Sequence, residues 1–364
     1  MRNCRHVIKS LPGDRQVTRR LRPVSNHTHH GNDAGTPRKA NALILAMLLC
    51  LSGWSVEANA QTLPPPDVVK VPAGLDLGGS SFYDGFGSTT PGWTLIDVPR
   101  WTHSTSIKDN NGNNSQLFVN PRIDAFSNLF HLVYVLPMHL PGGALAVEAL
   151  LPVVGFDTRF DAPGTVLHAH GWDIGDLTFG VDYQAQPTLL GRESLFCWRF
   201  GLDFNTPTGA FDATKDLNPG AGFWSITPYL AASVLPVPKW EISTRLTYDY
   251  NFSTTRGADP PPIPGFTFHD GQAGQALVIN FASSYAVSAG IRPGINGYWL
   301  GQITDDRTNG HIVPAARANS LYLGPGVFWQ ASPRSVVDFN IYLPVEVKNG
   351  SSGPQFNIQT IIQF

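Results

Sequence analysis

The chain has 364 residues, of which only 14% are charged, and it contains 36 Gly and 30 Pro residues. Its mean hydropathy of −0.08 excludes a helical membrane protein on bulk composition. A membrane β-barrel stays open, because a strand that meets lipid with every second residue needs only half of its positions to be apolar. Composition alone leaves a secreted β-protein equally open.

The first predicted element is a secretory signal peptide. Two basic residues, 38–39, precede an apolar stretch of about 15 residues, which is short for a membrane span. The small residues 58–60, Ala-Asn-Ala, follow it. This order is typical of a cleaved export signal, with cleavage before Gln61. Residues 1–37 are basic and His-rich, and we interpret them as an over-long start; residues 1–60 together form an N-terminal extension plus signal peptide.

Removal of residues 1–60 changes the charge of the chain. They contain nine of the 25 Lys and Arg residues and three of the 27 Asp and Glu residues, which leaves 16 basic and 24 acidic residues, a net charge of −8. A chain of this charge lacks the electrostatic basis for binding nucleic acid. Cys4 and Cys50 lie in the leader, so Cys197 is the last cysteine and an internal disulfide is excluded.

Strands are predicted along the rest of the chain by strict alternation of apolar and polar residues. The clearest example is WEISTRLTYDYNF at residues 240–252, which is long for a strand of a soluble protein. We predict about 12 strands, at residues 92–106, 126–137, 144–154, 174–185, 195–206, 222–235, 239–253, 273–287, 288–302, 320–331, 334–346 and 355–364. The same pattern suits a sandwich core or a strand with one face toward lipid.

Connection lengths favour the membrane barrel. Short connections such as PVPK alternate with long ones such as GFDTRFDAPGTVLHAHGW, and loops this long are uncommon in compact domains. Short periplasmic turns and long extracellular loops are typical of outer-membrane barrels. We therefore predict an all-β fold, a transmembrane antiparallel up-and-down β-barrel over residues 91–364. Residues 61–90 would be a periplasmic lead-in or a small plug, with the mature N-terminus on the side of the short turns.

The last strand carries a predicted assembly signal. The chain ends FNIQTIIQF, and five alternate residues share one face: Phe356, Ile358, Thr360, Ile362 and Phe364. A closing strand with an aromatic last residue resembles the signal that the outer-membrane barrel assembly machinery recognises. The expected partners are therefore this machinery and outer-membrane lipid.

Charged residues in the opposite phase are predicted to point into the barrel. As candidates for a lumen that defines selectivity we name Asp182, Arg199, Asp203, Glu241, Arg245, Asp249, Arg292 and Asp338, and the same phase adds Glu346. About 12 strands leave little interior space unless lumen residues are small. Gly201, Gly290 and Gly294 are the residues expected to open such space.

Catalytic and metal-binding patterns are weak. No Gly-x-Ser-x-Gly or His-Glu-x-x-His motif is present, so we predict no enzyme, no catalytic residue and no cofactor. His168 and His170 could place two imidazoles on one face of a loop, but without an assignable carboxylate partner we favour ordinary surface histidines and predict no metal site. Carboxylates at Asp305, Asp306 and Asp270 are likewise interpreted as solvated loop residues.

Several segments resemble one family of Gram-negative outer-membrane proteins. They are YDGFGSTTPGW (83–93), DNNGN (109–113), ALLPVVGFD (149–157), GDLTFGVDY (175–183) and GLDFNTPTGAFD (201–212). The arrangement resembles the MetA-pathway of phenol degradation, or SphA-like, transporter family over roughly residues 80–364. The resemblance implies a porin-like channel in the outer membrane for passive uptake of small hydrophobic or aromatic compounds. The alternative is a non-transporting barrel whose extracellular loops bind a partner or matrix.

Overall fold

The computed structural model describes residues 64–71, 75–138 and 140–364. The strands that form the wall of the barrel are β1 (Gly92–Ser104), β3 (Val119–Val135), β4 (Gly143–Asp161), β6 (Thr178–Ala185), β8 (Ser194–Asn205), β9 (Ser225–Val237), β10 (Trp240–Asn251), β12 (Ala276–Tyr285), β13 (Ile291–Gln302), β16 (Asn319–Ser332), β17 (Ser335–Lys348) and β19 (Gln355–Gln363). Short strands lie between them: β2 (Ser106–Lys108), β5 (Asp173–Ile174), β7 (Thr188–Leu190), β11 (Gly271–Gln272), β14 (Arg307–Thr308), β15 (His311–Ile312) and β18 (Gly350–Ser352). Among these described residues there is no helix of the length and hydrophobicity that crossing a bilayer requires.

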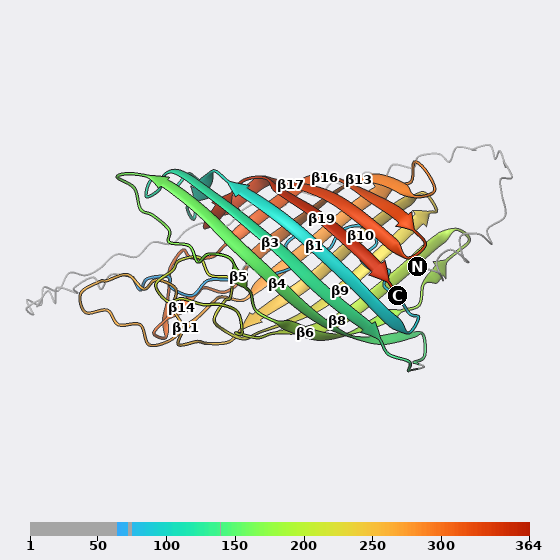
Figure 1. Ribbon diagram of the computed structural model, residues 1–364, viewed down its shortest axis with the longest axis horizontal. Coiled ribbons are helices and arrows are strands. Elements are labelled where there is room, and N and C mark those ends of the chain that lie inside the picture. The colour runs from blue at the N-terminus through green and yellow to red at the C-terminus, as the bar shows by residue number, and fades with distance from the viewer. Residues whose placement is uncertain (1–63, 72–74, 139) are drawn as a thin grey trace, which may run out of the picture. The chain divides into compact units, whose positions relative to one another are not determined.

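The sheet closes on itself as an antiparallel barrel of 12 strands, as the sequence predicted. Each wall strand pairs with its neighbour in sequence, and β1 pairs with the last strand, β19, from Thr94↔Gln363 to Thr102↔Gln355. Closure leaves no sheet edge to be satisfied in lipid, which is why a barrel can span a membrane. The tilted strands β1, β3, β4 and β19 lie side by side in Figure 1.

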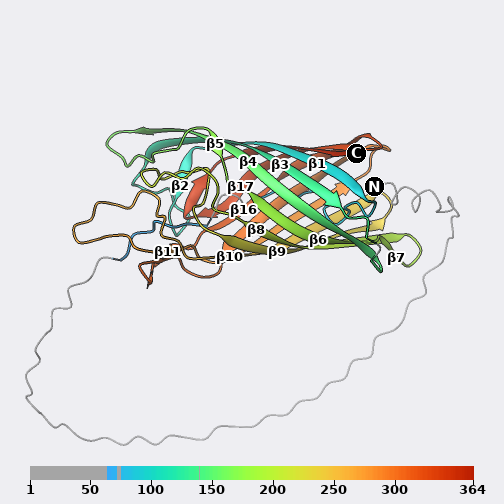
Figure 2. The same cartoon turned by 60° about the horizontal axis from the view of Figure 1, so that its bottom comes forward.

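Connections of two kinds lie at the two ends of the barrel. The C-terminus and β7 are at one end, whereas β2, β5 and β11 lie with the long loops at the other (Figure 2). Strands β3 and β4 are longer than predicted, because their ladder continues to the pair Val119↔Asp161. The long-loop end is therefore built partly from paired strands.

The outer face of the wall is apolar and the interior face polar. Phe130, Val181 and Phe200 are 45%, 44% and 48% exposed on the outside, while Asn280 and Asp249 are buried inside. Aromatic pairs lie toward both ends of the outer face: Trp93 lies tilted against Tyr134 with ring centroids 4.5 Å apart, and Trp101 stacks on Phe356. Such belts are typical of the two interfaces of a bilayer.

The five residues named as an assembly signal share the outer face of β19 and the chain end. Phe356 and Ile358 are 38% and 42% exposed, and the terminal Phe364 is 70% exposed. The backbone N–H of Phe364 donates to the carbonyl of Trp93 at 3.0 Å, which ties the end of the chain to the start of β1. Recognition by an assembly machinery stays a prediction.

Candidate functional site: the barrel interior and its N-terminal segment

The interior is occupied by the described residues that precede β1, here called the N-terminal segment (residues 64–71 and 75–91). Its start lies among the long loops, where the hydroxyl of Thr308 donates to the carbonyl of Pro66 at 2.8 Å. Val68 and Val69 pack in the same place against Phe223. The sequence analysis expected this start at the end with short turns. The mature N-terminus itself, Gln61, lies outside the described residues, but Pro66 lies at the opposite end, because the segment passes through the barrel before β1 begins beside the C-terminus.

Apolar side chains of the segment are buried against the inside of the wall in successive clusters. The members are Leu75 with Ala276, Val278 and Leu300; Phe82 with Ala282, Phe328 and Val336; and Phe86 with Leu195, Cys197 and Leu235. The alternating pattern of the wall strands predicts a polar inner face, so it does not predict these apolar clusters inside the barrel. They show that the barrel has a core of its own, which the segment completes.

A turn at Gly78 fixes the middle of the segment. Its φ of +76° is in the left-handed region that favours glycine. The Gly78 N–H donates to Asn280 Oδ1 at 2.8 Å, and its carbonyl accepts from the Tyr342 hydroxyl at 2.9 Å and from Asn357 Nδ2 at 2.8 Å. A Cβ at this position would lie 2.7 Å from the Tyr342 ring. Residue 78 therefore has to be glycine for this packing.

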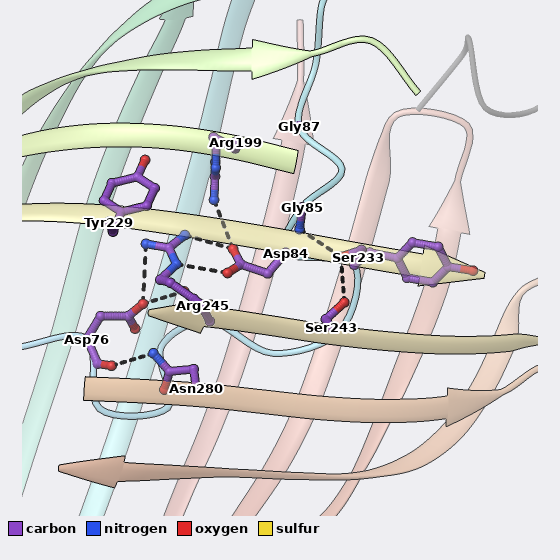
Figure 3. A network of polar contacts seen from close by, with 12 residues as sticks. Asp76, Asp84, Gly85, Gly87, Arg199, Tyr229, Ser233, Ser243, Arg245 and Asn280 are labelled. Atoms are coloured by element: carbon purple, nitrogen blue, oxygen red, sulfur yellow. Dashed lines mark hydrogen bonds and ion pairs between the residues drawn. The ribbon is translucent and has the colours of Figure 1, made fainter. Parts of the chain in front are cut away.

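Asp84 is the main charged anchor of the segment. Arg245 binds its two carboxylate oxygens at 2.8 and 2.7 Å, and Arg199 Nη2 reaches Oδ1 at 2.9 Å (Figure 3). Bidentate contact with a buried carboxylate is among the strongest side-chain interactions.

Two further groups complete the surroundings of Arg245. Asp76, also in the segment, lies 3.4 Å from Nη1 of Arg245. The guanidinium carbon of Arg245 lies 4.2 Å from the centre of the Tyr229 ring, a cation–π contact. Figure 3 shows Asp76, Asp84 and Tyr229 arranged around the Arg245 side chain.

A second polar group lines the wall on β3, β4, β6, β8 and β9. His131 Nε2 lies 2.6 Å from Glu148 Oε2, and the Tyr229 hydroxyl donates to Glu148 Oε1 at 3.1 Å. Asp182 Oδ2 and Asp203 Oδ1 are buried and have no hydrogen-bond partner among the residues that the structure describes. The Asp203 side chain also shares a hydrogen bond with Glu148, so the oxygens free to contact water or a passing cation are Asp182 Oδ2 and Asp203 Oδ1.

All eight lumen candidates point into the barrel, but they do not form one site. Arg199 and Arg245 meet through Asp84. Glu241 and Arg292 meet through the Ser284 hydroxyl, which donates to Glu241 Oε2 at 2.7 Å and lies 3.2 Å from Arg292 Nε. The others are Asp182 and Asp203 in the group just described, Asp249 beside Asn251, and Asp338, neither of whose oxygens has a partner within the described chain.

Glu346 and the three glycines do not behave as predicted. A bulge in β17, where Leu321 pairs with Glu346 but Tyr322 with Pro344, reverses the phase, so Glu346 lies outside beside Lys348 at 2.7 Å. A Cβ at Gly201 would lie 2.3 Å from the Tyr229 ring, and one at Gly294 2.7 Å from Phe82. These glycines make room for aromatic rings, and Gly290 lies against the Gln330 carbonyl.

Sequence reasoning missed the groups that organise the interior. Glu148 has the inward phase of its predicted strand, so alternation could have found it. Asp84 lies in the YDGFG motif, but nothing in the spacing connects it with Arg199 and Arg245, which are 115 and 161 residues away. Such contacts come from barrel closure around the segment.

A pocket of about 650 Å³ opens between two long loops. Gly209, Phe211 and Ala213 line it from the β8–β9 loop, and Thr255, Arg256, Gly257, Pro260 and Phe268 line it from the loop after β10. This volume is within the usual range of small-molecule sites. Phe268 also packs against the cluster of Val68, Val69 and Phe223, so the pocket adjoins the start of the segment.

The sequence matches the model of the family described as "Putative MetA-pathway of phenol degradation" over residues 104–360. The chain belongs to this family. No curated protein matches the sequence significantly.

Among solved structures, an outer membrane channel from Pseudomonas putida F1 is similar at a TM-score of 0.64 and 15% identity, covering 78% of this chain and 98% of that one. The translocator domain of the autotransporter NalP from Neisseria meningitidis gives a TM-score of 0.41 at 9% identity, covering 77% of this chain and 91% of the other. The transport unit of the autotransporter AIDA-I from Escherichia coli gives 0.43 at 10% identity, covering 76% and 90%. The first likeness shows a shared barrel fold.

Proposed function

We propose that this family member is a passive channel in the outer membrane of a Gram-negative bacterium for small hydrophobic or aromatic compounds. Export through a signal peptide cleaved before Gln61, and assembly through the closing strand, belong to the same proposal. The observation that carries the substrate class is the loop pocket. Phe211, Pro260 and Phe268 offer apolar surface, and Arg256 offers a guanidinium that stacks well on an aromatic ring.

One side chain links the pocket with the N-terminal segment that occupies the interior. Phe268 lines the pocket and packs against Val68 and Val69 of the N-terminal segment. A ligand that displaces this ring removes apolar contacts that hold the start of the segment. We therefore propose that ligand binding loosens the segment and opens a passage along the wall that carries Glu148, Asp182 and Asp203.

Planar-bilayer recordings of the purified chain test this function. We expect small single-channel currents that change when simple phenols or alkylbenzenes are added on the side of the long loops. Phe268→Ala should weaken this response about tenfold, whereas Glu346→Gln, which changes an outward residue, should leave it intact. Steady currents that ignore every aromatic compound would contradict the proposed substrate class.

A second candidate is a barrel that does not transport and binds a partner or matrix with its loops. The charged anchor at Asp84 favours it, because a segment held by two largely buried arginines closes the interior firmly. Trp172 and Leu117, which are 65% and 66% exposed on or beside the loops, offer contact surface. Silent bilayers from a folded, heat-modifiable barrel, with or without aromatic compounds, would favour this candidate over the channel.

A further inference from the structure

Three potential metal ligands from three different long loops converge outside the barrel interior. They are His168 in the β4–β5 connection, Asp216 in the β8–β9 loop and Asp259 in the β10–β11 loop. His168 Nδ1 lies 3.8 Å from an oxygen of each carboxylate, and the three ligand atoms lie within 4.8 Å of one another. The sequence offered His168 without a carboxylate partner; the fold supplies two.

The backbone brings these side chains together without a metal. The His168 N–H donates to Asp216 Oδ2 at 2.7 Å, and the His168 carbonyl accepts from the N–H of Asp216 at 2.9 Å. The N–H of Asp259 donates to the Ala213 carbonyl at 3.0 Å, which holds its loop against the loop of Asp216. Backbone hydrogen bonds between the loops therefore bring the three residues together, and their side chains face one another.

The charge of the cluster is not balanced by protein cations. Among the described residues, no Lys or Arg nitrogen lies within 4.0 Å of either carboxylate, and the neighbour of both is an imidazole. The His168 and Asp259 side chains are 60% and 41% exposed, so an ion can enter from solvent. Two carboxylates and one imidazole have the charge and the donor atoms for a divalent cation.

We propose that His168, Asp216 and Asp259 bind one divalent transition-metal ion, such as Zn²⁺, that ties the three loops together. An imidazole nitrogen with two carboxylates suits Zn²⁺, Co²⁺ or Ni²⁺, whereas Ca²⁺ and Mg²⁺ prefer ligands that are all oxygen. With bonds of about 2.0–2.2 Å, ligand atoms lie about 3–3.5 Å apart, so the side chains have to close by about 1 Å. Water completes the coordination.

The site adjoins the pocket but does not depend on its function. Asp259 directly precedes Pro260, and its backbone partner Ala213 also lines the pocket. A bound metal would fix the two loops that form the pocket walls. Binding can be measured without any transport assay, so failure of the channel proposal and failure of this proposal are separate results.

Calorimetric titration of tag-free protein in detergent with Zn²⁺ tests the proposal. We expect one ion that His168→Ala, Asp216→Asn and Asp259→Asn each weaken more than about 100-fold, since even partners outside the coordination sphere are worth about 10–100-fold in affinity. His170→Ala, two residues from His168 and outside the cluster, is the matched control and should bind as the wild type does. Ca²⁺ at equal concentration should not compete.

The heat-modifiable shift in electrophoresis shows that each variant is folded, so a loss of binding cannot be a loss of the barrel. Zn²⁺ should also slow protease cleavage of the long loops in the wild type and in His170→Ala, but not in Asp259→Asn. Absence of Zn²⁺ binding overturns the proposal, and so does binding that the three substitutions leave unchanged or that Ca²⁺ displaces.

Discussion

Two aspartates of the N-terminal segment hold it in opposite ways. Asp84, inside the barrel, is bound by Arg199 and Arg245. Asp67, among the long loops, lies beside a second carboxyl group, Asp306, which is 2% exposed. The inner contact joins unlike charges, whereas the outer contact joins two carboxyl groups and therefore depends on a proton that the inner contact does not need.

The outer contact requires a proton. Asp306 accepts from the Gly274 N–H at 2.6 Å and from Gln302 Nε2 at 2.7 Å, and its side chain shares a hydrogen bond with Asp67. Burial and the charge of Asp67 raise the pKa of Asp306 to about 8. Burial also raises the pKa of Asp67, although Lys70, 3.8 Å away, opposes this. A change in pH should therefore detach the outer end of the segment from the long loops before it detaches the inner part from the wall.

The largest effect is expected from Asp84→Ala. It leaves Arg199 without its ion-pair partner and leaves Arg245 with Asp76 alone, and removal of one partner of a buried ion pair costs about 3–5 kcal/mol. The segment should leave the interior, and the single-channel conductance should rise several-fold.

Asp76→Asn is the control for Asp84→Ala, because Asp76 is 24% exposed and lies farther from Arg245, so its effect should be much smaller. If Asp84→Ala has the same conductance as the wild type, the ion pairs of Asp84 do not hold the segment inside the barrel.

Gly78→Ala should have the next largest effect. The new Cβ would lie 2.7 Å from the Tyr342 ring at a φ of +76°, so both packing and backbone conformation oppose it. We expect a loss of about 1–3 kcal/mol in segment docking, measured as faster hydrogen exchange at residues 75–87. Gly171→Ala, where a Cβ meets nothing within 4 Å, should leave this exchange unchanged.

Raising the pH should release the outer end of the segment and leave the inner anchor in place. Because the docked pKa of Asp306 is raised, docking takes up a proton, so the outer contact is strongest below 3.8 and weakens as the pH rises to about 8. The inner contact joins Asp84 to two guanidinium groups and needs no added proton, so the same rise in pH leaves it in place.

Maleimide labelling of Val69→Cys, a buried position, should accordingly be faster at pH 8.5 than at pH 5. The added Asp306→Asn should remove this increase, after correction for the thiol's own titration. Labelling with the same pH dependence in both backgrounds would show that Asp306 does not control the outer end.

The smallest effect is expected from Asp182→Asn. It removes one inward carboxylate from a wall with several, so the preference for cations over anions should fall about twofold. Glu346→Gln removes the same charge from the outer face and should not alter ion selectivity, which reversal potentials in a salt gradient measure. Equal shifts in the two variants would argue against a passage along this wall.

The strands could be predicted because alternation is a local property that the barrel preserves. Residues 239–253 were expected to form a strand, and β10 spans Trp240–Asn251. Glu346 was predicted to face inward, but a single bulge in β17 reverses the inward–outward alternation, and no residue in the sequence indicates that bulge. Gly201 was taken for empty space because the ring that fills it, Tyr229, lies on another strand. The segment's path was missed because its partners are set by closure of the barrel.

One measurement tests most directly whether the N-terminal segment controls the passage. Phe86 packs in one cluster with Cys197 of the wall, so Phe86→Cys brings a second thiol close to Cys197, and oxidation is used to form a disulfide that locks the segment to β8. Mass spectrometry establishes that the bond has formed, and the same bilayer is then recorded before and after reduction. The account predicts that oxidised channels do not respond to aromatic compounds and that reduction restores the response. An undiminished aromatic response with the disulfide intact would contradict it.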